Sequence, residues 1–391
     1  MTSALRFPEA APAGDCSSLR VNLSCLIVRD CRNIARADLE VSPDGLALVG
    51  ENGQGKTNLL EAIAYLSLLR SMRGVRDRHL LRFGTPAFHL MAEAEHARAR
   101  RVGVGVDRTG RKTVSLDGVE TVRVSDGLGA IPSVCFSPAD IALVAGSPAE
   151  RRRFLDTVLA LSSRRYLSAL REYRAALARR NAALRHRPRR AGHVSAIAAW
   201  EPALAQHGAV LLEERRDWVT GTAPLFSTMC ALIGESEPMH MAYHSQIVKP
   251  DAPSDVHTML VEALARSREL DTQRGFTHVG PHRDDLSLAL SDRELRLFGS
   301  AGQQRTAAIA LRLLEATTLR ERTRAQPLLL LDDPLAELDR HRCSRLLALL
   351  NEISGAGLAQ TIVCVPREEE VPAAFSRLPR CRMRAGVVSK I

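Results

Sequence analysis

Residues 45–66 read GLALVGENGQGKTNLLEAIAYL, and this stretch decides the fold. The apolar run at 46–49 predicts a buried strand, and the amphipathic segment after Lys56 predicts a helix. Between them lies G-x-x-x-x-G-K-T, in the strand–loop–helix context that gives this pattern its meaning. Glycines let such a loop turn tightly, so its N–H groups and the positive end of the helix surround a phosphate. The stretch therefore predicts a site for a nucleoside triphosphate.

Each polar residue of the loop has an expected role. Lys56 is predicted to neutralise oxygens of the β- and γ-phosphates, and the Thr57 hydroxyl is predicted to hold Mg²⁺. ATP and Mg²⁺ are thus the expected cofactors. The loop residues predicted to contact the nucleotide are Gly50, Glu51, Asn52, Gly53, Gln54, Gly55, Lys56, Thr57 and Asn58.

A second buried strand is predicted at residues 327–333, PLLLLDD. Four consecutive leucines suit a parallel strand that is covered on both faces. Asp332 at its end is expected to bind Mg²⁺, and Asp333 is expected to orient or deprotonate the attacking water. Lys56 and Asp333 are therefore the predicted catalytic residues. Because 276 positions separate Lys56 from Asp332, an inserted domain must lie between them.

The segment 298–306, FGSAGQQRT, precedes an Ala/Leu-rich helix and then the acidic strand. Ser-x-Gly-Gln followed by a helix and an acidic strand is the order of the signature segment of ABC-type ATPases, which acts on nucleotide held by the other subunit. A Ser hydroxyl, a Gly N–H and a helix N-terminus suit a γ-phosphate. The alternative is a plain helix-capping turn. The residues expected to act across subunits are Ser300, Gly302, Gln303 and, in the D-loop-like AELD, Asp339.

Charge is concentrated in residues 151–190. The whole chain has a net charge of +10, whereas this segment alone holds thirteen arginines against two acids, a net charge of +11. Apolar residues at helical spacing, from Tyr166 to Leu184, predict a helix that Pro188 ends. A solvated helix face and a protein-binding surface are open alternatives to polyanion binding. The candidate DNA-binding residues are Arg151, Arg152, Arg164, Arg165, Arg171, Arg174, Arg179 and Arg180.

Composition excludes other classes of protein. With 45% hydrophobic and 25% charged residues, the chain has the composition of an ordinary globular protein. No apolar run approaches the roughly 18 residues of a membrane span, and the N-terminus has no secretory pattern. The eight cysteines form no C-x-x-C pair, so no structural zinc site is predicted. We expect a cytoplasmic protein without a membrane partner.

Five segments in order resemble the RecF family of bacterial recombination mediators, whose ATPase head is similar to those of SMC-type proteins. The resemblance runs from about residue 20 to near the C-terminus. The matching segments are LVGENGQGKTNLLEAI (48–63), FSPADIALVAGSPAERRRFLD (136–156), GPHRDDL (280–286), GSAGQQRT (299–306) and LLLLDDPLAELD (328–339).

The resemblance implies an α/β fold with an ABC/SMC-type P-loop ATPase head formed by both chain ends and an inserted, mainly helical lobe. The expected parts are an N-terminal extension (1–20), the first part of the ATPase lobe (21–150), the helical arm (151–275) and the second part of the ATPase lobe (276–391). The resemblance also places Arg32 and Asn33 beside the nucleotide. For GPHRDDL, a turn joining two strands and a position near nucleotide or DNA remain alternatives.

The implied function is an ATP-dependent clamp that dimerises on double-stranded DNA near single-strand gaps. It implies cooperation with RecR and RecO in loading RecA. Asp333 stands where related ATPases usually carry Glu, so we expect weak, DNA-stimulated ATP hydrolysis that times release. An ABC-type ATPase subunit of another machine is the alternative. Three other classes fit the sequence less well. A transporter subunit typically carries a switch His and a nuclease requires a further metal cluster, and neither is found in the sequence. A small-molecule kinase does not need the signature segment, which the sequence has.

Overall fold

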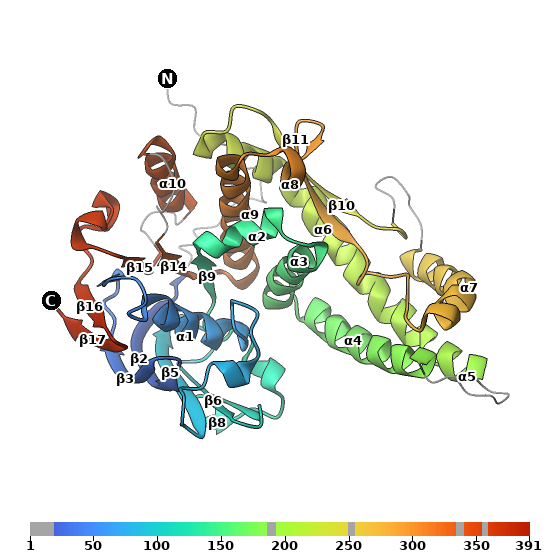
Figure 1. The fold of residues 1–391 in the computed structure, drawn as a ribbon, viewed down its shortest axis with the longest axis horizontal. Helices are drawn as coiled ribbons and strands as arrows, with labels where there is room; N and C mark the ends of the chain where they lie inside the picture. The colour runs from blue at the N-terminus through green and yellow to red at the C-terminus, as the bar shows by residue number, and fades with distance from the viewer. Residues whose placement is uncertain (1–18, 186–192, 249–254, 334–339, 354–358) are drawn as a thin grey trace.

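The computed structural model describes residues 19–185, 193–248, 255–333, 340–353 and 359–391. The N-terminal extension, except for its last two residues, and Asp339 lie outside these ranges, as does Pro188. Figure 1 shows two parts: a head in which strands surround helix α1 (Lys56–Leu68), and an arm of helices that extends to the right.

The centre of the head is a six-stranded sheet whose strands come from both halves of the chain. Its order is β17-β16-β4-β15-β14-β9, and all neighbouring pairs are parallel except β16 with β17. The strands are β4 (Gly45–Val49), β9 (Ser133–Phe136), β14 (Leu328–Asp332), β15 (Thr361–Val365), β16 (Arg380–Arg384) and β17 (Val387–Lys390). The predicted α/β head built by both chain ends is therefore confirmed.

The run of four leucines in β14 faces two hydrophobic cores. Leu328 and Leu330 pack into the core that contains α1, whereas Leu329 and Leu331 pack into the core on the opposite face of the sheet. Side chains of a strand alternate between faces, so a continuous apolar run is required where both faces are covered. The strands β4, β14 and β15 are thus buried along their whole length, whereas the edge strands β16 and β17 are partly exposed.

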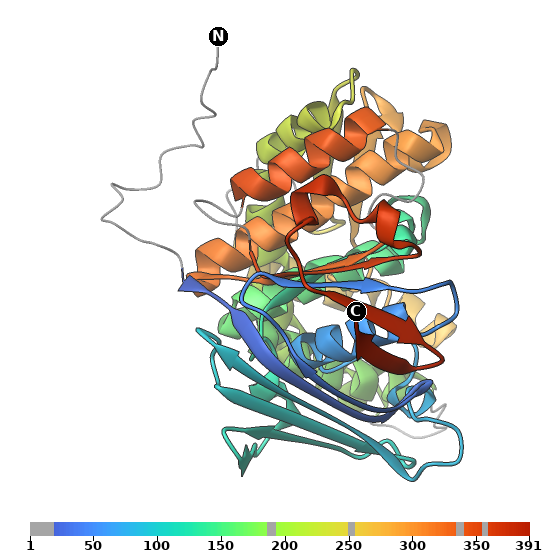
Figure 2. The same ribbon diagram turned by 90° about the vertical axis from the view of Figure 1, so that its left-hand side faces the viewer.

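A second, antiparallel sheet covers the α1 side. Its order is β3-β2-β5-β6-β7-β8, and Figure 2 shows these blue and teal strands curving below α1. Its strands are β2 (Asn22–Cys31), β3 (Ile34–Glu40), β5 (Ala87–Glu95), β6 (Arg101–Asp107), β7 (Lys112–Leu116) and β8 (Val119–Glu120). Tyr65 of α1 packs edge-on against Phe88 of β5, with ring centroids 5.5 Å apart. Helix α1 is therefore held between two sheets.

Helices cover the other face and form the arm. Helices α2, α3 and α9 pack on the head, and α4 to α7 form the arm. A three-stranded sheet, β10-β11-β12, joins the head and the arm. These elements are α2 (Ala142–Ala145), α3 (Pro148–Ser162), α4 (Arg164–Arg185), α5 (His193–Ala198), α6 (Glu201–Ile233), β10 (Met239–His244), α7 (Val256–Arg274), β11 (Asp285–Leu290), β12 (Arg293–Glu294), α8 (Leu295–Phe298), α9 (Ala301–Thr323) and α10 (Arg340–Ile353). The short strands β1 (Leu19–Arg20) and β13 (Ala325–Gln326) pair in parallel.

The helix predicted from apolar spacing is α4. Tyr166, Tyr173 and Leu184 are buried along one face of it, as the spacing predicts. Within the described residues, no helix combines the length and apolarity that crossing a membrane would take.

The GPHRDDL segment forms a polar joint between head and arm. Here "arm joint" denotes residues 280–286 and their partners. The Pro281 carbonyl accepts from Arg215 of α6 at 2.7 Å, and Tyr173 of α4 hydrogen-bonds His282 at 2.7 Å. Asp285 forms an ion pair with Arg151 of α3 at 2.7 Å. The segment thus contacts three helices, which favours a structural role over direct nucleotide contact.

Candidate nucleotide site and the surfaces around it

The phosphate loop joins β4 to α1 in a conformation that requires glycine. Gly55 has φ +114°, and a Cβ there would lie 2.7 Å from the Asn33 side chain. A Cβ on Gly50 would lie 2.4 Å from the Met383 carbonyl oxygen of β16. The loop is therefore fixed by neighbouring strands as well as by its own sequence.

The loop brings Lys56, Thr57 and Asp332 together as predicted. Lys56 is only 7% exposed, and its ammonium donates to the carbonyls of Gly50 and Glu51, the latter at 3.0 Å. The Thr57 hydroxyl donates to Asp332 Oδ1 at 2.9 Å, across 275 positions of sequence. Burial raises the pKa of the Asp332 carboxyl, and the Thr57 hydrogen bond opposes this rise. A buried cation and a buried acid thus lie at the carboxyl edge of the parallel sheet.

This donor set fits Mg²⁺. Thr57 and Asp332 offer a hydroxyl and a carboxylate oxygen, the hard ligands that Mg²⁺ prefers, and a nucleotide supplies further oxygens in such sites. The described residues contain no group of three or more His, Cys, Asp or Glu that could hold a metal by themselves. The arrangement therefore suits an ion that is bound together with phosphate.

Asp333 follows directly at the end of β14. Its backbone N–H donates to the Cys364 carbonyl at 2.9 Å, and its φ is +49°. A non-glycine residue in this left-handed region is uncommon and is often found at functional sites. The strand therefore ends directly before the residue predicted to act on water.

Asn33, which the resemblance places beside the nucleotide, contacts the phosphate loop. Its side-chain amide donates to the Gln54 carbonyl at 2.9 Å, and its Oδ1 accepts from the Asn58 amide at 2.9 Å. Gln54 is also held by the turn between β16 and β17, because Gln54 Oε1 accepts from Ala385 N at 2.6 Å and the Gln54 carbonyl accepts from Gly386 N at 2.9 Å. Asn52 and Gly53 lie between Glu51 and Gln54 in the loop.

Arg32 is held by a buried acid that the sequence analysis missed. Its guanidinium forms two hydrogen bonds, of 3.0 and 3.1 Å, with Oε2 of Glu61 in α1. Glu61 is 1% exposed and also accepts from Ser71 at 2.5 Å. In the sequence, Glu61 reads as an ordinary polar position of an amphipathic helix. Only the second sheet, which covers α1, turns that position into a buried one.

The signature segment caps helix α9. Ser300 Oγ accepts from Gln303 N at 3.2 Å, and Gln303 Oε1 accepts from Ser300 N at 2.9 Å, a reciprocal capping box. The capping alternative is thus realised in the structure, and the Ser300 side of α9 remains exposed. A Cβ on Gly302 would lie 3.1 Å from Arg342 Nη1 of α10, so the Arg342 guanidinium lies close to the first turn of α9.

The structure contradicts two of the predicted DNA-binding arginines. Arg180 is 0% exposed and forms ion pairs with Asp271 at 2.7 Å and Glu201 at 3.0 Å. Arg151 is buried beside Asp285. Their acids come from outside residues 151–190, so a charge count within that segment could not include them.

The other six predicted arginines keep solvent contact. Arg165, Arg171 and Arg174 each lie within 4 Å of a carboxylate, while Arg179 stacks over the Trp200 ring at 5.0 Å. Arg152 donates to the backbone carbonyl of Asp284 at 2.7 Å, and Arg164 at the start of α4 is exposed. The basic surface is therefore smaller than the sequence count implied.

Known proteins resemble this chain over almost its whole length. The family model described as "RecF/RecN/SMC N terminal domain" matches residues 22–390. A "DNA replication and repair protein RecF" of Anaeromyxobacter dehalogenans is 39% identical over 95% of this chain and 100% of the relative. The protein of the same name from Roseiflexus castenholzii is 37% identical over 92% of this chain and 98% of the relative.

Solved structures of related proteins resemble this chain as well. The structure of "the recombination mediator protein RecF-ATP in RecFOR pathway" has a TM-score of 0.86 and 26% identity, and the match covers 97% of this chain and 100% of that one. An Smc head domain from Pyrococcus furiosus, with a TM-score of 0.54, 18% identity and coverage of 95% and 96%, shares the fold alone. The chain belongs to the RecF family, and its head has the ABC/SMC-type fold.

Proposed function

We propose that this protein is an ATP-dependent DNA clamp of recombinational repair and replication. Two copies would close on double-stranded DNA near single-strand gaps when ATP binds, and slow hydrolysis would release them. The observation that carries the proposal is the hydrogen bond between Thr57 and Asp332 beside the buried Lys56, at one edge of the sheet. The ATP-bound RecF relative supports ATP as the nucleotide.

Each residue of the nucleotide site has its own role in the proposed function. The loop N–H groups and Lys56 would bind phosphate oxygens, and Asn33 would hold the loop in shape through Gln54 and Asn58. Thr57 and Asp332 would hold Mg²⁺, which in such sites neutralises charge on the phosphates. Asp333 would orient water, and its side chain is one methylene shorter than that of Glu, which favours slow hydrolysis.

The positions of α1 and α9 support the proposed dimerisation. These helices pack on opposite faces of the parallel sheet, so the exposed Ser300 end of α9 belongs to a different surface from the residues packed around α1. Beside Ser300, Leu297 and Phe298 are 62% and 64% exposed. Large apolar residues left exposed next to a phosphate-binding helix end support a protein interface there. A second copy would bring its phosphate loop to this end.

DNA contact is supported by a basic cavity of about 430 Å³ where the arm leaves the head. Arg70 after α1, Arg152 and Arg153 of α3 and Arg174 of α4 line it, and Asp156 there is already shared by Arg174 and the buried Arg215. Excess guanidinium groups suit phosphate backbones without sequence preference. RecR and RecO are the proposed partners in RecA loading, because the ATP-bound relative acts in the RecFOR pathway.

The dimer model is tested with Ser300→Arg, which places bulk and charge on the exposed helix end. ATP binding by the single copy should be unchanged, while ATP-dependent self-association should be lost. Ser195→Arg, on exposed α5 of the arm, is the matched control and should still dimerise. Equal loss of nucleotide binding and dimerisation in Ser300→Arg would instead place Ser300 in its own chain's nucleotide site.

A further inference from the structure

A second basic cavity lies on the far side of the head from the nucleotide site. Its volume is about 520 Å³, and it lies between the β5–β6 loop, the start of α4 and the end of α9. Pro132, which precedes β9, and Ala325 of β13 line it, so it lies at the amino edge of the parallel sheet. Lys56 and Asp332 lie at the carboxyl edge. We name it the Arg98–Arg164 cavity.

The α9 helix separates this cavity from the signature segment. Arg322, which lines the cavity, is 22 residues beyond Ser300 along this helix. At 1.5 Å per residue, the two ends are about 33 Å apart. The cavity is therefore independent of the surface proposed for dimerisation.

The cavity carries a strong positive charge. Five arginines line it, and Asp126 is the sole carboxylate among its lining residues. In the described part of the chain, only Arg171 of these five lies within 4 Å of a carboxylate. The lining arginines are Arg98, Arg123, Arg164, Arg171 and Arg322. Asp126 is itself engaged, because its carboxylate accepts from the Arg123 backbone N–H at 3.2 Å.

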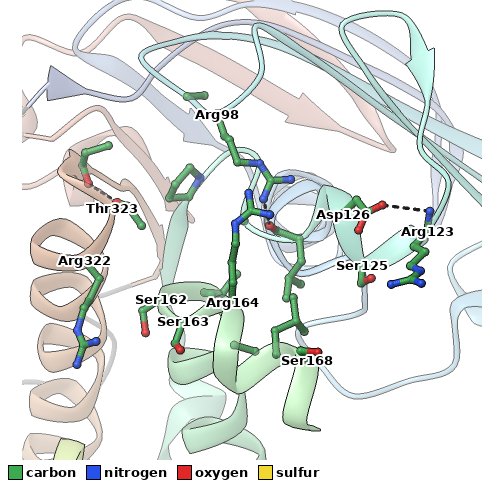
Figure 3. Close-up of a pocket in the computed structure, with 18 of the residues that line it drawn as sticks. Arg98, Arg123, Ser125, Asp126, Ser162, Ser163, Arg164, Ser168, Arg322 and Thr323 are labelled. Atoms are coloured by element: carbon green, nitrogen blue, oxygen red, sulfur yellow. Dashed lines mark hydrogen bonds between the residues drawn. The ribbon is translucent and has the colours of Figure 1, made fainter. Parts of the chain in front are cut away.

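Two of the guanidinium groups face each other. Figure 3 shows Arg98 reaching down and Arg164 reaching up until their ends lie side by side. Arg98 is anchored by a hydrogen bond of 3.2 Å to the Leu128 carbonyl. Partial burial and then the Arg164 charge lower the pKa of Arg98, and the Asp126 carboxylate offsets only part of this effect, so the two guanidinium groups repel each other. An anion bound between them would remove that repulsion.

The remaining lining suits phosphate rather than a base. The lining also holds five hydroxyl groups, and those of Ser162, Ser163 and Thr323 already donate to protein oxygens, so Ser125 and Ser168 are the hydroxyl donors offered to an anion. None of the lining residues is Phe, Tyr or Trp. Guanidinium forks bind phosphate oxygens in pairs, and Ser and Thr hydroxyls add hydrogen bonds. Base stacking needs aromatic rings, and the imidazole of His96 is the sole aromatic ring among these lining residues. The chemistry therefore favours a backbone phosphate.

We propose that the Arg98–Arg164 cavity binds a phosphate of the DNA backbone, at the edge of the head opposite the nucleotide site. The proposal rests on the proposed DNA-binding function and adds a second point of contact to it. Since this contact does not involve the surface proposed for dimerisation, it holds DNA without ATP. DNA would then bind a single copy first, and ATP would close the dimer afterwards.

The test uses the full chain with Arg98→Gln/Arg164→Gln, without nucleotide. Fluorescence anisotropy measures binding of a short labelled duplex between about 50 and 200 mM salt. We expect affinity to fall about ten-fold and the slope of log K against log salt to drop by about 2. The matched control is Arg36→Gln/Arg266→Gln, which removes the same charge from exposed side chains elsewhere. ATP binding should be unchanged in both variants.

The other outcomes are decisive against the proposal. Equal weakening by the control pair would mean that net charge alone sets affinity, and unchanged duplex binding by the Arg98/Arg164 variant would overturn the site. Titrations with inorganic phosphate and with polyglutamate identify other anions. A variant that loses either of these but keeps duplex binding would show that the cavity takes a free anion or an acidic peptide. If the wild type binds no duplex even with ATP, the proposed function itself fails.

Discussion

The phosphate loop and the arginine-rich helices are both conspicuous in the sequence, but they differ in how well the sequence predicts the contacts of their side chains. In the loop, a short segment specifies the backbone, and Lys56, Thr57 and Asp332 meet as the motif predicts. In α3 and α4, the side chains lie on the predicted helices, but Arg180 and Arg151 are buried in ion pairs.

The difference lies in where the partners come from. The loop motif and the acid at the end of a buried strand can each be recognised from local sequence, although the fold brings Asp332 to Thr57 across 275 positions. The arginines meet acids of α6, α7 and β11, which only the folded arm brings near. A phosphate loop can thus be recognised from local sequence. Whether an arginine is free to bind DNA depends on which acids the folded arm brings near it.

The sharpest test of this contrast compares two adjacent arginines. Arg180→Met should destabilise the protein by about 3–5 kcal/mol, because Asp271 and Glu201 would each lose a buried partner. Arg179→Met, next along the same helix, loses only a stacking contact with Trp200 and should cost about 1 kcal/mol or less. Urea unfolding of both variants gives the comparison. Similar costs would mean that the ion pairs around Arg180 add little.

At the loop, Lys56→Met should reduce ATP binding and hydrolysis by about 10²–10³-fold, as loss of one charge-stabilising donor does elsewhere. DNA binding that depends on ATP should be lost with it, while the fold persists. Lys390→Met at the exposed C-terminal strand is the control and should behave as wild type. Nucleotide titration and circular dichroism check both points. Retained ATP-dependent DNA binding would rule out the proposed mechanism.

At the arm joint, pH should act through His282. Burial lowers its pKa to about 4, so the folded protein takes up this proton later than the unfolded chain, whose His titrates near 6.5. Stability is therefore complete above pH 6.5 and falls as pH drops toward 4, by about 2 kcal/mol after allowance for partial exposure. His282→Gln should remove this contribution from the difference between unfolding midpoints at pH 7 and pH 5. An identical pH dependence in both proteins would contradict it.

The smallest effect concerns Asp332. Burial raises the pKa of its carboxyl, so the ionised form costs stability at neutral pH, and this cost appears as pH rises through the raised pKa. Asp332→Asn keeps an acceptor for Thr57 and should raise the apparent Tm in metal-free buffer at pH 7 by about 1–2 °C, while hydrolysis is lost. Differential scanning fluorimetry measures the shift, and a lower Tm would show that the carboxylate stabilises the fold.

Much of the head could be predicted from the sequence, because its strands and loops have local patterns. The run Leu328–Leu331 indicated a strand covered on both faces, and the loop glycines indicated the turn into α1. Glu61 could not be predicted, since nothing near it in the chain shows that a second sheet buries it. Arg98 belongs to no segment of the resemblance, and only the fold brings it to Arg164.

In the proposed function, ATP joins two copies of the protein on DNA. Sedimentation velocity of the wild type with ATP, ADP or no nucleotide, each with and without a gapped duplex, measures this most directly. We expect monomers without nucleotide or with ADP, and an ATP-specific dimer that the duplex strengthens. A protein that stays monomeric with ATP and still binds the duplex would contradict it, and DNA binding would then belong to the arginine surfaces alone.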